Sequence, residues 1–114
     1  MTMKTSELTG AALDWAVSKA DNPPGQEGGM DWWERDSEGY LFDPLNECRY
    51  SPSTNWAQGG PIINRERIEL KPTYAGWTGF LGNKFFGNGT TPLEAAMRCY
   101  VASKLAMKSE YRRN

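Results

Sequence analysis

The spacing of apolar residues predicts a helix near each end of the chain. The first helix is expected over residues 9–20, with Thr9 as its N-cap. Its apolar positions recur at spacings of three and four: Leu8, Ala12, Trp15 and Ala16. Residues 22–25 have the sequence NPPG and end this helix, because proline and glycine interrupt helical backbone.

The second helix has a clearer beginning. Thr91 is placed as an N-cap, Pro92 occupies the first helical position and Glu94 completes a capping box. One face of this helix is apolar: Leu93, Ala96, Met97, Tyr100, Val101 and Leu105. Residues 109–114 are expected to fray at the terminus.

Two short strands are predicted between the helices. They cover residues 32–34 and 40–42, and a turn at 36–39 joins them. The preceding residues 21–31 are rich in glycine and proline, which predicts a loop.

Residues 62–70 are a further strand candidate, and an alternative is a turn at 64–66 followed by a strand at 67–70. Residues 74–80 are a strand candidate that two glycines weaken. The glycine- and asparagine-rich residues 81–90 are predicted to form a loop.

These elements indicate an α+β fold in a single domain spanning residues 1–114. We expect a small, mainly antiparallel sheet with two helices packed on one face. Long loops would join the short strands, and such loops often carry function.

Charge and composition narrow the class of protein. The chain has 13 basic and 14 acidic residues, and this balance argues against a duplex DNA-binding protein. No apolar run approaches the roughly 18 residues of a membrane span, and the N-terminus lacks the apolar core of a signal peptide. We therefore expect a soluble cytoplasmic protein that does not bind membranes.

Catalytic and metal-binding chemistry have little support in the sequence. Histidine is absent, which removes the commonest general base and metal ligand. Cys48 and Cys99 are expected to be free thiols, and the acidic residues within 31–38 are typical of a solvated face. A binding protein without cofactor or metal is favoured over an enzyme.

The strongest candidate for a binding site lies in residues 55–60. Trp56 offers an aromatic face for a planar ligand such as a nucleobase, and Asn55 and Gln58 offer amide edges. Gly59 and Gly60 would let backbone N–H groups approach a ligand closely. The alternatives are that the glycine pair forms a turn and that Trp56 packs over the sheet.

Two further features are compatible with an anion-binding site. Arg65 and Arg67 would share one face of a continuous strand, although surface ion pairs with nearby glutamates would equally explain them. Residues 87–92 lead into a helix N-terminus, but its capping box favours an ordinary capped helix over an anion site. The phosphate-loop pattern of nucleotide hydrolases is absent from this segment.

Three blocks of sequence resemble one known family. They are KTSELTGAALDWAVSKA at 4–20, YSPSTNWAQGGPIINRERI at 50–68 and GTTPLEAAMRCYVASKL at 89–105. In this order they resemble the small NinX-like proteins of lambdoid and other tailed phages. The resemblance implies an accessory protein made inside an infected bacterium. The family's acidic tail is missing, because this chain ends in SEYRRN.

The lead hypothesis is a non-enzymatic phage protein that binds a small ligand. The ligand would be a nucleotide immune signal, such as a cyclic dinucleotide or an ADP-ribose derivative, which the protein sequesters to counter host defence. The predicted ligand-binding residues are Asn55, Trp56, Gln58, Gly59, Gly60, Arg65, Trp77 and Arg98. We expect a homo-oligomer, because small proteins often build pockets at symmetric interfaces.

Two other functions stay open. The first is a protein-interaction module that inhibits or redirects a host or phage protein, since exposed tryptophans are frequent interface hot spots. The second is a single-stranded nucleic-acid-binding protein that uses the same aromatic residues, and the near-neutral net charge counts against it.

Overall fold

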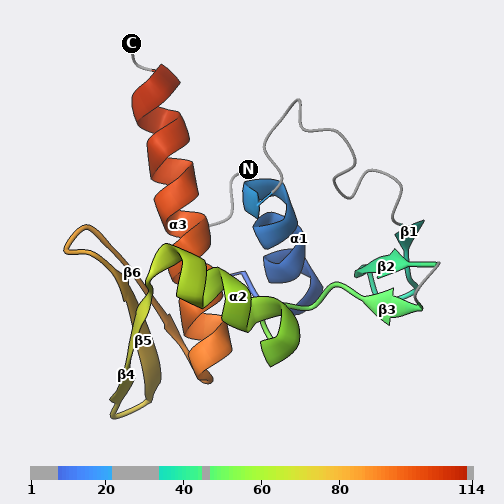
Figure 1. The fold of residues 1–114 in the computed structure, drawn as a ribbon, viewed down its shortest axis with the longest axis horizontal. Coiled ribbons are helices and arrows are strands. Elements are labelled where there is room, and N and C mark those ends of the chain that lie inside the picture. The colour runs from blue at the N-terminus through green and yellow to red at the C-terminus, as the bar shows by residue number, and fades with distance from the viewer. Residues whose placement is uncertain (1–7, 22–33, 45–46, 113–114) are drawn as a thin grey trace.

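The computed structural model describes residues 8–21, 34–44 and 47–112, with the backbone alone for Asp21 and for 106–112. The described residues form three helices and two three-stranded antiparallel sheets, whose arrangement can be followed in Figure 1. The helices are α1 (Gly10–Asp21), α2 (Trp56–Glu66) and α3 (Pro92–Arg112). The first sheet contains β1 (Glu34–Arg35), β2 (Leu41–Asp43) and β3 (Cys48–Arg49). The second contains β4 (Glu69–Thr73), β5 (Gly76–Leu81) and β6 (Phe85–Gly89). The α+β prediction is confirmed.

Helix α3 lies at the centre of the structure. It packs against the sheet β4–β5–β6 on one side and against α1 and α2 on the other (Figure 1). The buried core is formed by side chains of α1, α2, α3 and β2 and of the segments beside them: Leu13, Val17, Leu41, Tyr50, Ile62, Ile68, Ala96, Met97, Cys99, Tyr100 and Val101. Leu70, Leu81 and Phe85 of the second sheet pack against this core and are partly buried. The apolar face predicted for α3 is therefore its buried face, except at Leu105, which is 49% exposed.

The predicted loop at 81–90 is wrong, because Phe85–Gly89 forms the strand β6. The glycines that suggested a loop let this strand approach α3 closely. A Cβ atom on Gly87 would lie 2.5 Å from the backbone nitrogen of Cys99, and one on Gly89 would lie 2.6 Å from that of Ala95. Glycine is required here by the helix–sheet contact rather than by a turn.

The continuous strand predicted over 62–70 is also wrong. Residues Trp56–Glu66 form α2, and only Glu69–Thr73 is a strand. The side chain of Asn55 caps α2 by accepting from the backbone N–H of Ala57, and Arg67 ends it in the left-handed region at φ 58°. Arg65 and Arg67 consequently do not share a strand face.

The two terminal helices and the first hairpin were predicted close to their observed positions. The predicted loop at 21–31 lies outside the described residues, apart from Asp21, which belongs to α1. Helices α1 and α3 begin within one residue of their predicted starts, and the hairpin pairs β1 with β2 around the expected turn. Helix α3 continues to Arg112, past the point where fraying was predicted. Trp32 and Trp33 lie outside the described residues. Within the described residues, no helix combines the length and apolar character that a bilayer crossing requires.

Candidate functional site

The predicted ligand-binding residues fall into two separate groups in the structure. Six of them lie on or beside α2: Asn55, Trp56, Gln58, Gly59, Gly60 and Arg65. The other two, Trp77 of β5 and Arg98 of α3, line a common hollow. The two groups do not meet in one pocket among the described residues.

The amide groups beside α2 already have intramolecular partners. The side-chain oxygen of Asn55 accepts from the backbone N–H of Ala57 at 2.9 Å. Gln58 accepts from the backbone N–H of Ser51 at 2.6 Å and donates to the carbonyl of Arg49 at 2.9 Å. The two hydrogen bonds of Gln58 therefore join α2 to the segment that precedes it.

The two glycines of α2 lie in different environments. Gly59 is buried, and a Cβ atom there would overlap the carbonyl oxygen of Pro52 and lie 2.7 Å from Leu93 of α3. At Gly60 the nearest atom to such a Cβ is a ring carbon of Trp56, at 3.9 Å. The indole of Trp56 thus lies over Gly60, on the outer side of α2, and is 55% exposed.

Arg65 contributes to the packing of α2 on α3. Its Nε donates to the carboxylate of Glu66 at 2.8 Å, and its Nη2 donates to the hydroxyl of Tyr100 at 3.2 Å. The guanidinium carbon also lies 5.8 Å from the centre of the Tyr100 ring. These contacts resemble the surface pairing that was the alternative to an anion-binding role.

The Trp77–Arg98 hollow has a volume of about 390 Å³ and is more open than enclosed. It lies where the β4–β5 turn, the end of β6 and helix α3 come together. Its lining residues are Thr73, Ala75, Trp77, Asn88, Gly89, Thr90 and Arg98. One aromatic ring, one guanidinium and several amide or hydroxyl groups therefore converge on a space within the size range of ligand pockets.

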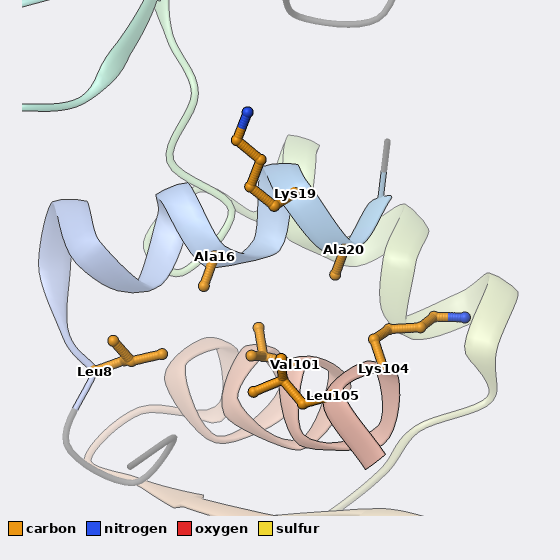
Figure 2. Close-up of a pocket in the computed structure, with 7 residues that line it drawn as sticks. All are labelled: Leu8, Ala16, Lys19, Ala20, Val101, Lys104 and Leu105. Carbon is orange, nitrogen blue, oxygen red and sulfur yellow. The ribbon is translucent and has the colours of Figure 1, made fainter. Parts of the chain in front are cut away.

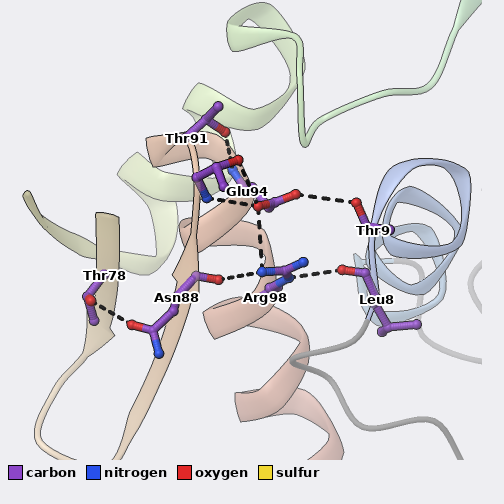
Figure 3. Close-up of polar contacts among 8 residues, drawn as sticks. Leu8, Thr9, Thr78, Asn88, Thr91, Glu94 and Arg98 are labelled. Carbon is purple, nitrogen blue, oxygen red and sulfur yellow. Dashed lines mark hydrogen bonds and ion pairs between the residues drawn. The ribbon is translucent and has the colours of Figure 1, made fainter. Parts of the chain in front are cut away.

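Hydrogen bonds hold Arg98 in a fixed position (Figure 3). Its Nε donates to the carbonyl of Leu8 at 2.9 Å, and its Nη1 donates to the carbonyl of Asn88 at 2.7 Å. Nη1 also lies 3.5 Å from the carboxylate of Glu94. The described contacts of Arg98 therefore use Nε and Nη1.

Glu94 joins the start of α3 to two other elements (Figure 3). Its carboxylate accepts from the backbone N–H of Thr90 at 2.9 Å and from the hydroxyl of Thr9 at 3.4 Å. The hydroxyl of Thr91 accepts from the N–H of Glu94 at 3.1 Å, which confirms the predicted cap. These bonds occupy the helix terminus, and the carboxylate offsets part of the positive charge of Arg98.

A second, apolar groove of about 180 Å³ lies between α1 and α3 (Figure 2). It is lined by Leu8, Ala16, Lys19, Ala20, Val101, Lys104 and Leu105. The ammonium of Lys19 lies 4.4 Å from the centre of the Trp15 ring, and that of Lys104 lies 3.9 Å from the carboxylate of Glu66. The groove therefore offers apolar surface without the stacking and hydrogen-bonding groups that a nucleotide requires.

Asp14 is a buried carboxyl that the sequence analysis did not single out. It accepts from the backbone N–H of Ser53 at 2.8 Å and so ties α1 to the segment before α2. Its Oδ2 and the hydroxyl of Ser53 have no hydrogen-bond partner among the described residues. Burial raises the pKa of Asp14 to about 6, and the hydrogen bond from the backbone N–H of Ser53 opposes this increase.

In the part of the chain that the structure describes, the thiols and carboxylates do not form a metal centre. Cys48 and Cys99 are free thiols, as predicted, and burial raises the pKa of Cys99 to about 11. Within the described residues, no cluster of three or more Cys, Asp or Glu side chains could hold a metal ion.

The residues therefore define a small α+β protein whose candidate site is a polar, aromatic hollow beside a central helix. The sequence profile of the family described as "Bacteriophage P22, NinX" matches residues 4–104. The chain belongs to this NinX family of phage proteins, and the resemblance of its three sequence blocks is confirmed. None of the curated proteins matches the sequence.

Membership in this family is consistent with a phage accessory protein. The sequence analysis named Trp77 and Arg98 but not Asn88 or Thr90, which also line the hollow. Residues 87–92 were considered only for the positive end of a helix. Asn88 and Thr90 border the hollow because Phe85–Gly89 is a strand, and the glycine-rich sequence did not indicate that strand. The carbonyl of Asn88 accepts from Arg98, whereas its side chain lies beside Thr78.

Proposed function

We propose that this NinX-family protein is a phage accessory protein that binds a small nucleotide-like ligand in the Trp77–Arg98 hollow. The observation that carries the proposal is the presence of an indole and a guanidinium in one polar space of about 390 Å³. Aromatic rings stack on nucleobases, and arginine donates to phosphate or carbonyl oxygens.

The electrostatics of the hollow favour a ligand with few negative charges. Arg98 is held 3.5 Å from Glu94, and its side chain is only 16% exposed. One partly neutralised guanidinium does not balance a triphosphate, but it suits a single phosphate or a base carbonyl. The proposed ligand is therefore a cyclic dinucleotide or an ADP-ribose derivative rather than a nucleoside triphosphate.

The proposed action is sequestration without chemical conversion. Histidine is absent from the chain, and the carboxylate nearest the hollow, Glu94, already accepts from Thr90 and Thr9. A protein that captures a nucleotide immune signal in this way would protect an infecting phage from the host response. In this proposal, Trp77 and Arg98 replace the α2 residues as the main ligand contacts.

Native mass spectrometry tests the proposal. The purified protein is mixed with cyclic dinucleotides and ADP-ribose derivatives, and the measurement reports both the subunit number and the bound mass. We expect one nucleotide to bind at a fixed ratio and to be recovered unchanged after denaturation. Recovery of an altered nucleotide would instead establish an enzyme.

A matched pair of tryptophan variants locates the site. Trp77→Leu removes the ring from the hollow, whereas Trp56→Leu removes an exposed ring from α2. We expect Trp77→Leu to weaken binding about 10-fold and Trp56→Leu to leave it unchanged, by isothermal titration calorimetry. Equal affinity of wild type and Trp77→Leu would exclude the hollow. Failure of every nucleotide to bind would favour the protein-interaction alternative.

A further inference from the structure

The sheet β4–β5–β6 has an inner face against α3 and an opposite outer face. Side chains alternate between the two faces of a strand. Gly79 and Gly87 are paired in the sheet, and both closely approach the backbone of α3. Their neighbours in sequence therefore point away from α3. Figure 1 shows the described helices on one side of this sheet only.

Two rows of side chains cross the outer face. The first row contains Glu69, Phe80 and Phe86, which are direct partners on the three strands. Phe86 is 63% exposed, and Phe80 is partly exposed beside it. Directly opposed residues of an antiparallel pair have Cβ atoms about 5 Å apart, so the two rings form a continuous aromatic surface.

The second row supplies hydrogen-bonding groups and a positive charge. It contains Lys71, Thr78 and Asn88, which are also direct partners on the three strands. The hydroxyl of Thr78 lies 2.6 Å from the side-chain oxygen of Asn88. The ammonium of Lys71 lies over the Phe80 ring, 5.5 Å from its centre, which places a positive charge at the aromatic surface.

The charges around the aromatic pair are mainly positive. Lys71 is exposed, and a second exposed lysine, Lys84, lies in the turn between β5 and β6, two residues before Phe86. Glu69 is the acidic residue of these strands. The local charge therefore differs from the net charge of −1 for the whole chain, and it suits an anionic backbone.

We propose that the outer face of β4–β5–β6 binds single-stranded nucleic acid, with bases stacked on Phe80 and Phe86 and phosphates near Lys71 and Lys84. Adjacent aromatic residues on neighbouring strands are an effective stacking surface for successive bases. The surface is distinct from the Trp77–Arg98 hollow, because Trp77 lies three residues, or about 10 Å, along β5 from Phe80.

The dimensions of the face favour a nucleic-acid strand over a second copy of the chain. Three strands spaced about 4.8 Å apart and about 17 Å long give a flat area of roughly 250 Å². A stable protein interface buries about 800 Å² on each partner, so this face alone is too small. Two exposed rings and two lysines are sufficient for two or three nucleotides.

Fluorescence anisotropy with labelled 12-nucleotide oligo(dT) and oligo(U) tests the proposal. Phe86→Ala is suitable because the ring is 63% exposed, and thermal melting verifies that the variant folds. We expect Phe86→Ala to weaken binding about 10-fold. Trp56→Ala, which removes an exposed ring from α2, should leave the affinity unchanged.

The salt dependence of oligonucleotide binding is a second measurement. It would not change if Lys71 had a purely structural role. Each phosphate contact contributes a slope of about −0.7 to log K against log salt for single strands. Lys71→Gln should therefore reduce the slope by about 0.7. The proposal is overturned if neither oligonucleotide binds at 50 mM salt, if duplex DNA binds equally well, or if Phe86→Ala binds as tightly as wild type. A dimer that Phe86→Ala dissociates, without any change in oligonucleotide binding, would assign the face to a second copy.

Discussion

The neighbouring glycines of α2 should respond in opposite directions to the same substitution. Gly59 and Gly60 both lie inside Trp56–Glu66, and both are replaced by alanine. Alanine is favoured over glycine in a helix by about 1 kcal/mol, because it loses less backbone entropy on folding. The intrinsic helix effect of the two substitutions is therefore the same, and the difference between them comes from the surroundings.

The surrounding residues determine whether alanine stabilises or destabilises the protein at each position. A Cβ atom on Gly59 would overlap the carbonyl oxygen of Pro52 and lie 2.7 Å from Leu93. Backbone cannot rotate away from such an overlap, so an overpacking cost of about 1 to 3 kcal/mol offsets the helix gain. At Gly60 the nearest atom is 3.9 Å away, which is ordinary van der Waals contact. We expect Gly60→Ala to stabilise the protein by about 0.5 to 1 kcal/mol.

Thermal and urea unfolding of the two variants measures this difference. We expect Gly59→Ala to lower the free energy of unfolding by up to about 2 kcal/mol, because the overpacking cost exceeds the gain in helix propensity there. The two variants would then differ by about 10 °C in Tm for a domain of this size. Equal destabilisation by both substitutions would refute the reasoning.

Three further predictions concern buried or capping groups. Asp14→Asn should become more stable relative to wild type as the pH rises from 4 to 7, by on the order of 1 to 3 kcal/mol in urea unfolding. The reason is that in this range Asp14 of the folded wild-type protein binds a proton that the unfolded chain releases. A stability difference that does not change with pH would contradict this. Asn55→Ala should cost about 1 kcal/mol of unfolding free energy through loss of the α2 cap, whereas Asn55→Ser should retain most of it. A thiol reagent should label Cys48 but not Cys99 in the native protein, and should label both after denaturation. Mass spectrometry counts the adducts on each molecule. Two adducts on the native protein would contradict the prediction, because they would show that Cys99 is accessible.

Local signals in the sequence were sufficient for the two terminal helices and the first hairpin. Thr91, Pro92 and Glu94 determine the start of α3 through their own backbone and side-chain bonds. The turn before Tyr40 is similarly local, because Asp36 accepts from the backbone N–H groups of Glu38 and Tyr40. Such interactions join residues close in sequence, so they can be predicted without knowing the tertiary structure.

The segments containing α2 and β6 could not be assigned in this way. Asn55 is a sound helix cap, but the following glycines and Pro61 are unfavourable in a helix and suggested a turn. Gly87 and Gly89 similarly suggested a loop. In both cases the reason for glycine is a contact with a distant segment: Pro52 and Leu93 for α2, and the backbone of α3 for β6.

The candidate site also combines features that the sequence predicts with features that depend on the tertiary structure. The sequence by itself determined the α+β class, the NinX-like blocks and the residue types suited to a planar anionic ligand. The tertiary structure decided which of those residues share a space: it placed Trp77 with Arg98 and left Trp56 on another surface. The physical reason is that packing of β4–β5–β6 against α3 depends on contacts between residues far apart in the chain, and local sequence patterns do not encode which distant surfaces meet.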